Sequence, residues 1–314
     1  MPLNRTDQAA ITPENIPLGL IPWAEPSHEH DIQAMIKAKT GAILFSGANS
    51  NLLQQSMRAL TVLDEKFVIV RTSRVTPSGK IEQLPNAHLA GLRLGRELLI
   101  MDRLNTPENV RAWRKIAQSG HKSAAPIQAN DPFHALEQML DLGLRHHDIG
   151  SPEFLAGCIH QEILPRLCDR CSEPISDAAK QGTQEKTGLE QFLNLFPTLD
   201  RHVQHIRIRG QNQDCTACNG TGLAGTVHCL ETFVPDVAIL AMLRSRRPEY
   251  ARDAWRKRTD GNPRSDNMLG KSWKDHAILH MLRGRVDPEE ALKPLGAWRQ
   301  PTQPQHLLHP DRRP

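Results

Sequence analysis

The chain has 314 residues, and its 39 lysines and arginines against 35 aspartates and glutamates give a formal net charge of +4. This length suggests about two domains. No apolar run approaches the roughly 18–20 residues that a membrane-spanning helix needs, and aromatic residues make up only 4% of the chain, so we expect neither direct membrane insertion nor a base-stacking nucleic-acid surface. The first residues lack the pattern of a secretory signal. We therefore expect a cytoplasmic protein whose six cysteines are reduced thiols or metal ligands.

The first half of the chain alternates short apolar runs with stretches of helical spacing. After an irregular entry over residues 1–17, the pattern predicts helices over 31–39, 51–63 and 106–118, and buried strands over 41–47, 67–70 and 98–101. Strands that alternate with helices predict an α/β fold with a parallel sheet.

The second half is more helical and contains a polar insertion between two cysteine pairs. The pattern predicts helices over 133–142, 152–167, 189–195, 237–243, 249–257 and 273–282, strands over 205–208 and 226–232, and a glycine turn over 219–222. The last residues, 297–314, carry four prolines and are expected to form a disordered tail.

Two cysteine pairs are the sharpest chemical signal. Cys168 and Cys171 are separated by two residues, as are Cys215 and Cys218. This spacing lets one tight turn aim two thiolates at a single ion, and four thiolates complete a tetrahedral zinc site with no open position, which is a structural site. A redox dithiol and unrelated core cysteines are the alternatives.

Other candidate groups carry weaker signals. Cys158 and Cys229 are expected to be core thiols, with Cys229 or His228 as a substitute ligand should one of the four fail. The stretch 28–31, His-Glu-His-Asp, could bind a metal but is more typical of a solvated loop. The run 244–247, Arg-Ser-Arg-Arg, could touch nucleic acid or acidic lipid, although scattered arginines on helices are usually only solvated.

Residues 47–54 lie where a phosphate-binding loop would lie, between a buried strand and a helix. Such a loop needs glycine at its first and sixth positions, lysine at the seventh and serine or threonine at the eighth. Only Gly47 matches, because Leu53 stands at the lysine position and Gln54 at the magnesium-binding position. Taken alone, the segment is typical of an ordinary strand-to-helix turn.

Beyond these features, the chain resembles the type II secretion and type IV pilus hexameric ATPases, the GspE/PilB/PilT superfamily, and most of all its conjugative-pilus branch. The resemblance spans residues 18–296 and is strongest in these segments: 119–121 (SGH), 129–131 (AND), 135–143 (ALEQMLDLG), 161–168 (QEILPRLC), 215–225 (CTACNGTGLAG), 275–277 (DHA) and 281–288 (MLRGRVDP). It implies a RecA-like sheet of the P-loop NTPase type, and a zinc held by paired cysteines, in agreement with their spacing.

The same resemblance implies that the ATPase motifs are degenerate. The family's acidic box falls at Arg71, where the charge is reversed. Arg103 replaces the glutamate expected to polarise the attacking water, with Asp102 shifted by one place, and Gln128 stands where a histidine belongs. Because phosphoryl transfer depends on positioning and charge stabilisation, we expect a pseudo-ATPase. The same losses argue against ATP and magnesium as cofactors.

The resemblance also organises the chain and its partners. It implies a degenerate ATPase core over 18–150, a tetracysteine subdomain over 151–232 and a helical region over 233–296. With about forty residues before the first strand, the family's N-terminal domain is expected to be absent. We expect an accessory subunit at the cytoplasmic side of the inner membrane, in a homo-oligomer or in a mixed hexamer with an active ATPase, working with a membrane platform protein.

Two alternatives remain open at this level. One is a divergent ATPase that uses Lys39, Lys66 or Lys80 in place of the missing lysine. The other is a zinc-dependent scaffold or nucleic-acid-binding protein.

Overall fold

A computed structural model describes residues 24–38, 40–61, 67–70, 73–75, 81–83, 98–101, 103–175, 203–210, 212–245 and 248–295. The chain forms two compact units. Unit 1 consists of Met1–Gln161 and Glu231–Arg258, and unit 2 of Glu162–Leu230 and Thr259–Pro314. The helix expected over 189–195, the entry over 1–17 and the tail over 297–314 lie outside the described residues.

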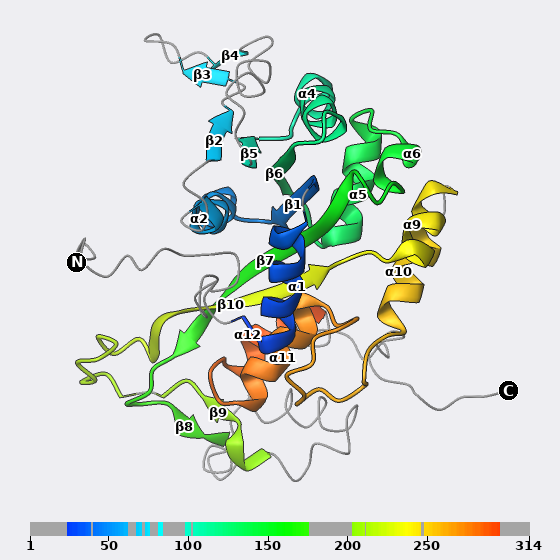
Figure 1. The fold of residues 1–314 in the computed structure, drawn as a ribbon. Coiled ribbons are helices and arrows are strands. Elements are labelled where there is room, and N and C mark those ends of the chain that lie inside the picture. Colours follow the sequence, from blue (N-terminus) through cyan, green and yellow to red (C-terminus); the bar gives the residue numbers. More distant parts are fainter. Residues whose placement is uncertain are drawn as a thin grey trace, which may run out of the picture. The chain divides into compact units, whose positions relative to one another are not determined.

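Unit 1 is built on a mostly parallel sheet (Figure 1). Its strand order is β10-β7-β1-β6-β5-β2. The strands are β1 (Gly41–Gly47), β2 (Phe67–Val70), β5 (Leu98–Met101), β6 (Lys122–Gln128), β7 (Leu155–Leu167) and β10 (Leu223–Phe233). β1 pairs in parallel with both β6 and β7, β5 pairs in parallel with β6 and with β2, and β7 and β10 continue along the chain into unit 2. The three strands expected from apolar runs, β1, β2 and β5, are confirmed.

Unit 1 also contains helices, several of which begin at a polar residue that caps them. They are α1 (Pro26–Lys37), α2 (Ser50–Thr61), α4 (Pro107–Gln118), α5 (Pro132–Asp141), α6 (His146–Ile149), α9 (Val237–Arg244) and α10 (Pro248–Arg256). Thr106 accepts a hydrogen bond from the N–H of Asn109, and Asp236 from that of Ile239, so each side chain satisfies an amide that the helix itself leaves open. A separate two-stranded ribbon joins β3 (Ser73–Val75) to β4 (Ile81–Gln83).

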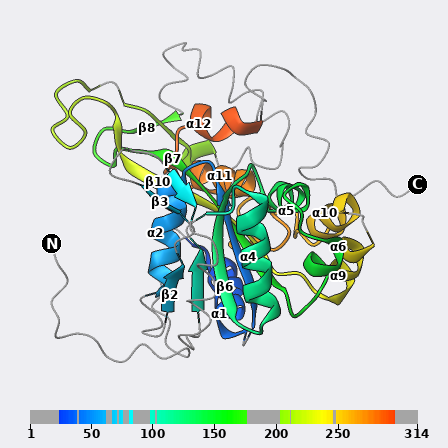
Figure 2. The ribbon, with the colours of Figure 1, turned by 90° about the horizontal axis from the view of Figure 1, so that it is seen from above.

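Aromatic side chains fill the core of unit 1. The Phe133 and Phe233 ring centroids are 4.8 Å apart, and Trp255 meets Phe233 edge-on at 5.1 Å. A second edge-on pair joins Trp113 to Phe154 at 5.5 Å. These residues come from five different elements and loops, so the core ties the segment Glu231–Arg258 to the sheet that precedes it in sequence. Figure 2 shows α4 alongside β6 in this unit.

Two expectations about regular structure are wrong or incomplete. Residues 152–167 were expected to form a helix, but Leu155–Leu167 form the long strand β7, because residues 155–160 pair with β1 as an interior strand. Such strands are apolar on both faces and lose the alternation that identifies a strand. Strand β6 was not expected at all, since its alanines and Pro126 have low strand propensity.

Unit 2 consists of short elements around a glycine-rich turn. They are the ribbon of β8 (Glu173–Pro174) with β9 (Arg207–Ile208), the helices α11 (Trp273–Leu282) and α12 (Pro288–Leu292), and a 3-10 turn at Lys293–Leu295. The expected turn over 219–222 is confirmed, and Asn219, Gly220 and Gly222 adopt left-handed backbone conformations there. Helix α11 begins with Ser272 and Asp275, each of whose side chains accepts a hydrogen bond from the other's backbone N–H. Among the described residues no helix is long and apolar enough to span a bilayer.

Candidate functional sites

The turn between β1 and α2 occupies the place of a phosphate-binding loop. Only Ala48 and Asn49 separate the last residue of β1 from the first residue of α2. The Asn49 side chain accepts a hydrogen bond from the N–H of Leu52 at 3.1 Å, and the Asn49 carbonyl accepts one from Leu53. The first turn of the helix therefore follows the strand directly, without the longer backbone cradle that surrounds a phosphate.

The residues on either side of this turn, Gly47 and Leu53, are closely packed. Leu53, at the expected lysine position, is 1% exposed. Gly47 lies so close to β7 that a β-carbon on it would be 2.2 Å from the carbonyl oxygen of Gln161. Both observations have a packing cause, because the apolar side chain and the missing side chain let helix α2 and strand β7 approach β1 closely.

The remaining expected nucleotide-site residues are only partly brought together. Gln128, at the histidine position, ends β6 and donates a hydrogen bond to the Ala48 carbonyl at 3.3 Å, so it lies beside the turn. Arg103 follows β5, two strands from β1 in the sheet. Arg71, Asp102 and the side chain of Gln54 lie outside the described residues, as do the three lysines considered as replacements (Lys39, Lys66 and Lys80).

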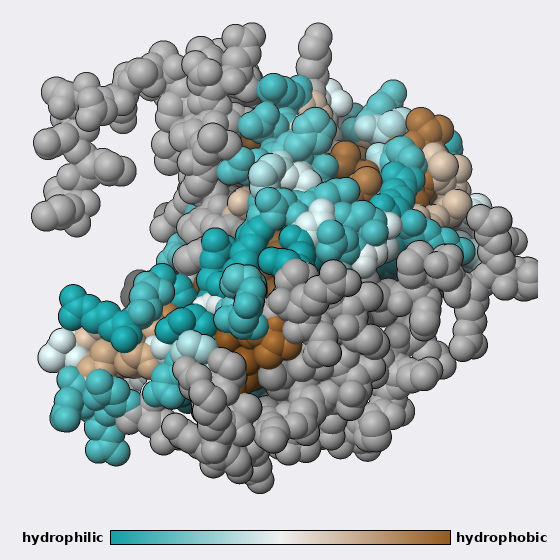
Figure 3. Space-filling view, turned by 90° about the horizontal axis from the view of Figure 1, so that it is seen from below, coloured by the Kyte–Doolittle hydropathy of each residue, from teal (hydrophilic) through white to brown (hydrophobic). Residues whose placement is uncertain are grey.

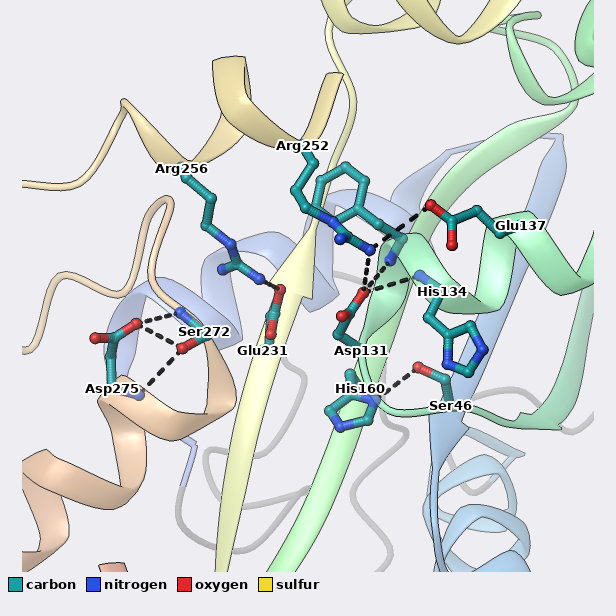
Figure 4. Close-up of polar contacts among 11 residues, drawn as sticks. Ser46, Asp131, His134, Glu137, His160, Glu231, Arg252, Arg256, Ser272 and Asp275 are labelled. Atoms are coloured by element: carbon teal, nitrogen blue, oxygen red, sulfur yellow. Dashed lines mark hydrogen bonds and ion pairs between the residues drawn. The ribbon is translucent and has the colours of Figure 1, made fainter. Parts of the chain in front are cut away.

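A charged network that the sequence did not indicate lies near the ends of β6 and β10 (Figure 4). Asp131 caps α5, and its carboxylate also pairs with Arg252 of α10 at 3.4 Å. One turn further along α10, Arg256 pairs with Glu231, whose side chain is fully buried. Both guanidinium groups lie over the Phe133 ring, with their carbon atoms 5.6 and 5.9 Å from its centroid.

Next to this network, two side chains of β7 pair with polar side chains of β1 and α2. Ser46 of β1 and His160 of β7 are joined by a 3.0 Å hydrogen bond between Oγ and Nδ1, and the Ser56 hydroxyl donates to the Gln161 side chain. Burial lowers the pKa of His160 to about 3, with Asp131 opposing the shift and Arg256 adding to it. His160 is therefore a neutral imidazole at physiological pH. The sequence did not indicate these pairs, because Ser46 and Ser56 are about a hundred residues away from His160 and Gln161 and meet them only in the folded chain.

The four expected metal ligands come together in unit 2. Their Sγ atoms all lie within 4.8 Å of one another, and all four residues are buried. The Sγ atoms of Cys168 and Cys215 are 3.9 Å apart, and those of Cys171 and Cys218 are 3.5 Å apart. A tetrahedral zinc ion with Zn–S bonds of about 2.3 Å would place its sulfurs about 3.8 Å apart. The four sulfur donors and their spacing therefore fit a single metal ion with four thiolate ligands.

Glycines and backbone amides shape this cysteine cluster. The N–H of Gly222 donates to the Cys218 sulfur at 3.3 Å. Burial opposes ionisation of Cys218, but this hydrogen bond and the neighbouring thiols lower its pKa to about 7. Gly210 lies against Cys171, where a β-carbon would be only 1.6 Å from the carbonyl oxygen. The arrangement can hold a metal ion structurally, and four protein ligands leave no position for a substrate.

The other candidate ligands have structural environments. Cys158 and Cys229 are buried core thiols, as expected, and burial raises the pKa of each well above its ordinary value. Residues 28–31 belong to helix α1 and not to a solvated loop, and His28 is fully buried. Its Nδ1 accepts a hydrogen bond from the Glu25 N–H at the start of the helix, so this polar stretch forms the first turn of α1.

Comparisons with known proteins agree with this geometry. A family model described as "Type II/IV secretion system protein" matches residues 98–272, more than half of the chain. The protein transport protein HofB homolog of Haemophilus influenzae is 24% identical over 105 residues, which are 33% of this chain and 22% of that protein. The type IV pilus assembly ATPase PilB of Thermus thermophilus is 22% identical over 147 residues, 47% of this chain and 15% of that protein. The chain thus spans less than a quarter of either relative.

Solved structures give the same result for the fold. The pilus retraction motor PilT with bound ADP superposes with a TM-score of 0.54 at 12% identity, over 83% of this chain and 62% of that one. The ATPase DotB of Legionella pneumophila gives 0.53 at 14% identity, over 85% and 63%. The sheet is therefore that of the PilT and DotB ATPases. Together with the match of the family model, this means that the chain belongs to the type II/IV secretion system protein family.

Proposed function

We propose that this protein is a pseudo-ATPase of the type II/IV secretion family, which acts as an accessory subunit in type IV pilus assembly or protein secretion. The observation that carries the proposal is the two-residue turn between β1 and α2, with Leu53 packed in the core behind it. A nucleotide site at this edge of the sheet needs backbone amides around the phosphates and a lysine beside them.

The chemistry of the neighbouring positions supports the same proposal. Arg103 brings a positive charge to the position where the family resemblance implies an acid that activates water, and Gln128 bonds to the turn itself. Loop amides, lysine and acid together provide most of the transition-state stabilisation in phosphoryl transfer. A chain that lacks the loop amides, the lysine and the acid should therefore not hydrolyse ATP, although it keeps the fold.

The role that remains is one of binding. We propose that the protein joins copies of itself or a mixed hexamer with an active ATPase, on the cytoplasmic side of the inner membrane next to a platform protein. The tetracysteine cluster would hold a structural zinc ion in unit 2, which constrains the turns around Cys168 and Cys215. Because four thiolates leave no open coordination position, such an ion would be structural and not catalytic.

Phosphate release by the purified protein, measured with magnesium and ATP, tests the proposal. We expect no release above the background of a mock purification, and no magnesium-dependent nucleotide binding by calorimetry. The decisive controls are the variants Lys39→Ala, Lys66→Ala and Lys80→Ala, which address a divergent ATPase with a displaced lysine. Hydrolysis by the wild type that one of these variants abolishes would overturn the proposal.

A gain-of-function variant sharpens the test. Leu53→Lys restores the residue type at the lysine position, but the side chain at this position is buried in the core. We expect this variant to lose stability and to gain no nucleotide affinity, because the two-residue turn provides no cradle. Nucleotide binding by Leu53→Lys would show that the turn can still form a phosphate site. Co-purification with an active pilus or secretion ATPase tests the accessory role separately.

A further inference from the structure

Helix α9 exposes an apolar stripe that ends in a basic residue. Val237, at its first position, is 81% exposed, and Ala241 and Arg244 are exposed four and seven positions later. These positions lie on one face of a helix. The opposite face, with Ile239 and Leu243, is buried in the core. The helix is thus apolar on both sides, although one side faces solvent.

Basic groups of α6 lie beside the end of this stripe. Arg145 and His147 are exposed, and the Arg244 guanidinium donates a hydrogen bond to Nδ1 of His147 at 3.0 Å. The backbones are close as well, since a β-carbon on Gly150 would lie 2.5 Å from that of Arg244. Figure 1 shows α6 next to α9, and in the space-filling view apolar residues surface among hydrophilic ones on the side where α9 lies (Figure 3).

We name this surface the α6–α9 face and define it by Arg145, His147, Val237, Ala241 and Arg244. Within the stretch 237–248, which Asp236 and Glu249 flank, the sequence contains three arginines and no aspartate or glutamate.

Two acids next to this face are paired within the chain. The buried Asp148 is held by Arg114 at 2.8 Å, and Asp236 by Arg258 at 2.6 Å. The exposed guanidinium groups of Arg145 and Arg244 therefore supply the positive charge of the face.

We propose that the α6–α9 face docks on an anionic phospholipid bilayer, with the basic groups at the headgroups and the apolar stripe at the interface. Basic residues near such a surface each contribute about fivefold in affinity, and an exposed apolar stripe adds binding only where it leaves water. Tyr250, 54% exposed at the start of α10, has the amphipathic character of a residue at a membrane interface. A nucleic acid would use the same arginines but would gain nothing from Val237 and Ala241, which is why a bilayer is favoured. The inference does not depend on whether ATP is hydrolysed.

Co-sedimentation of the full chain with vesicles tests the proposal without nucleotide. We expect binding to phosphatidylcholine vesicles that contain about 30 mol% phosphatidylglycerol, weakened strongly at about 0.5 M salt, and little binding to pure phosphatidylcholine. Arg145→Glu and Arg244→Glu should each weaken binding by fivefold or more. Arg145→Lys and Arg244→Lys, which keep the charge, should retain it.

Two further variants separate this face from general charge. Lys257→Glu reverses an exposed charge at the end of α10 in the same unit and should change binding by less than twofold. Val237→Ser leaves the net charge unchanged and should still weaken binding at low salt, since it removes apolar contact. Equal binding to both vesicle types, or an equal loss in Lys257→Glu and Arg244→Glu, would overturn the proposal. Binding to a short DNA duplex with none to anionic vesicles would also overturn it, in favour of a nucleic-acid surface.

Discussion

Acid should destabilise unit 1 through His160, a fully buried imidazole whose folded-state pKa lies near 3. In the unfolded chain the same group has its ordinary pKa of about 6.5. The unfolded state therefore binds a proton as the pH falls below about 6.5, while the folded state stays neutral until about pH 3. The contribution of the neutral His160 to the free energy of unfolding is therefore complete above pH 6.5, and it is lost progressively as the pH falls toward 3. At pH 5, about 1.5 pH units into this window, the loss amounts to about 2 kcal/mol.

Urea unfolding at pH 8 and pH 5, followed by tryptophan fluorescence, measures this loss. Trp113 and Trp255 are buried in unit 1, and a Trp273→Phe background removes a signal from unit 2. His160→Gln cannot titrate, so its unit-1 transition should lose about 2 kcal/mol less between the two pH values than that of the wild type. The absolute stability of this variant is lower at both values, because the hydrogen bond to Ser46 changes.

The matched control is His276→Gln. Burial, with Arg283 and Arg285 adding to the effect, lowers the pKa of His276 to about 3 as well, but this residue lies in unit 2. The control should therefore leave the pH dependence of the unit-1 transition unchanged. If wild type and His160→Gln lose the same free energy between pH 8 and pH 5, the reasoning from burial is refuted.

Three further variants test the buried charges and the cysteine cluster. Arg256→Met removes the guanidinium that pairs with the fully buried Glu231 carboxylate and should cost about 3 kcal/mol in urea unfolding, whereas the double variant with Glu231→Met should recover most of that loss. Lys271→Met should destabilise unit 2 by about 2–4 kcal/mol in a thermal or urea transition, because its 4%-exposed ammonium holds a carboxylate and two backbone carbonyls. If the cluster holds zinc as proposed, Gly210→Ala should lower the zinc content in elemental analysis relative to the wild type, since its methyl group would clash with the Cys171 carbonyl. A normal zinc content in that variant would mean that the loop adjusts without affecting the cluster.

The sequence predicts the parts of the fold that depend on local pattern. The runs at 41–47, 67–70 and 98–101 become strands because four or more consecutive apolar residues between turn signals have few other stable arrangements in a parallel sheet. The cysteine cluster is predicted for a similar reason, since a two-residue spacing by itself brings two thiols to one point. In both cases the information lies within a few neighbouring residues.

Contacts between distant segments account for what was not predicted. Strand β7 lacks the alternation of a half-exposed strand, and its pairing with β1 decides its structure. The contact of Arg252 with Asp131 depends on the return of the segment Glu231–Arg258 to unit 1, and the pair of Glu231 with Arg256 joins the two ends of that segment. A single sequence contains no signal for that return. The exposed stripe of α9 was missed because helical periodicity alone does not say which apolar face is covered.

Internal pairing at the sheet edge carries a last prediction about nucleotide. Gln128 bonds to the Ala48 carbonyl, and Ser46 and His160 bond to each other, so the ends of β1 and β6 and the adjoining part of β7 have partners within the chain. A ligand is therefore not needed to satisfy this edge. A nucleotide at about a hundred times its dissociation constant would raise the free energy of unfolding by about 2.7 kcal/mol. When millimolar magnesium-ATP is added to the full chain, we expect the free energy of unfolding of the unit-1 transition in urea to change by less than about 0.5 kcal/mol. The matched variant is Asn49→Ala, which removes the side-chain hydrogen bond to the Leu52 N–H at the start of α2. A rise of about 2 kcal/mol in the wild type that Asn49→Ala abolishes would show that the turn binds phosphate after all.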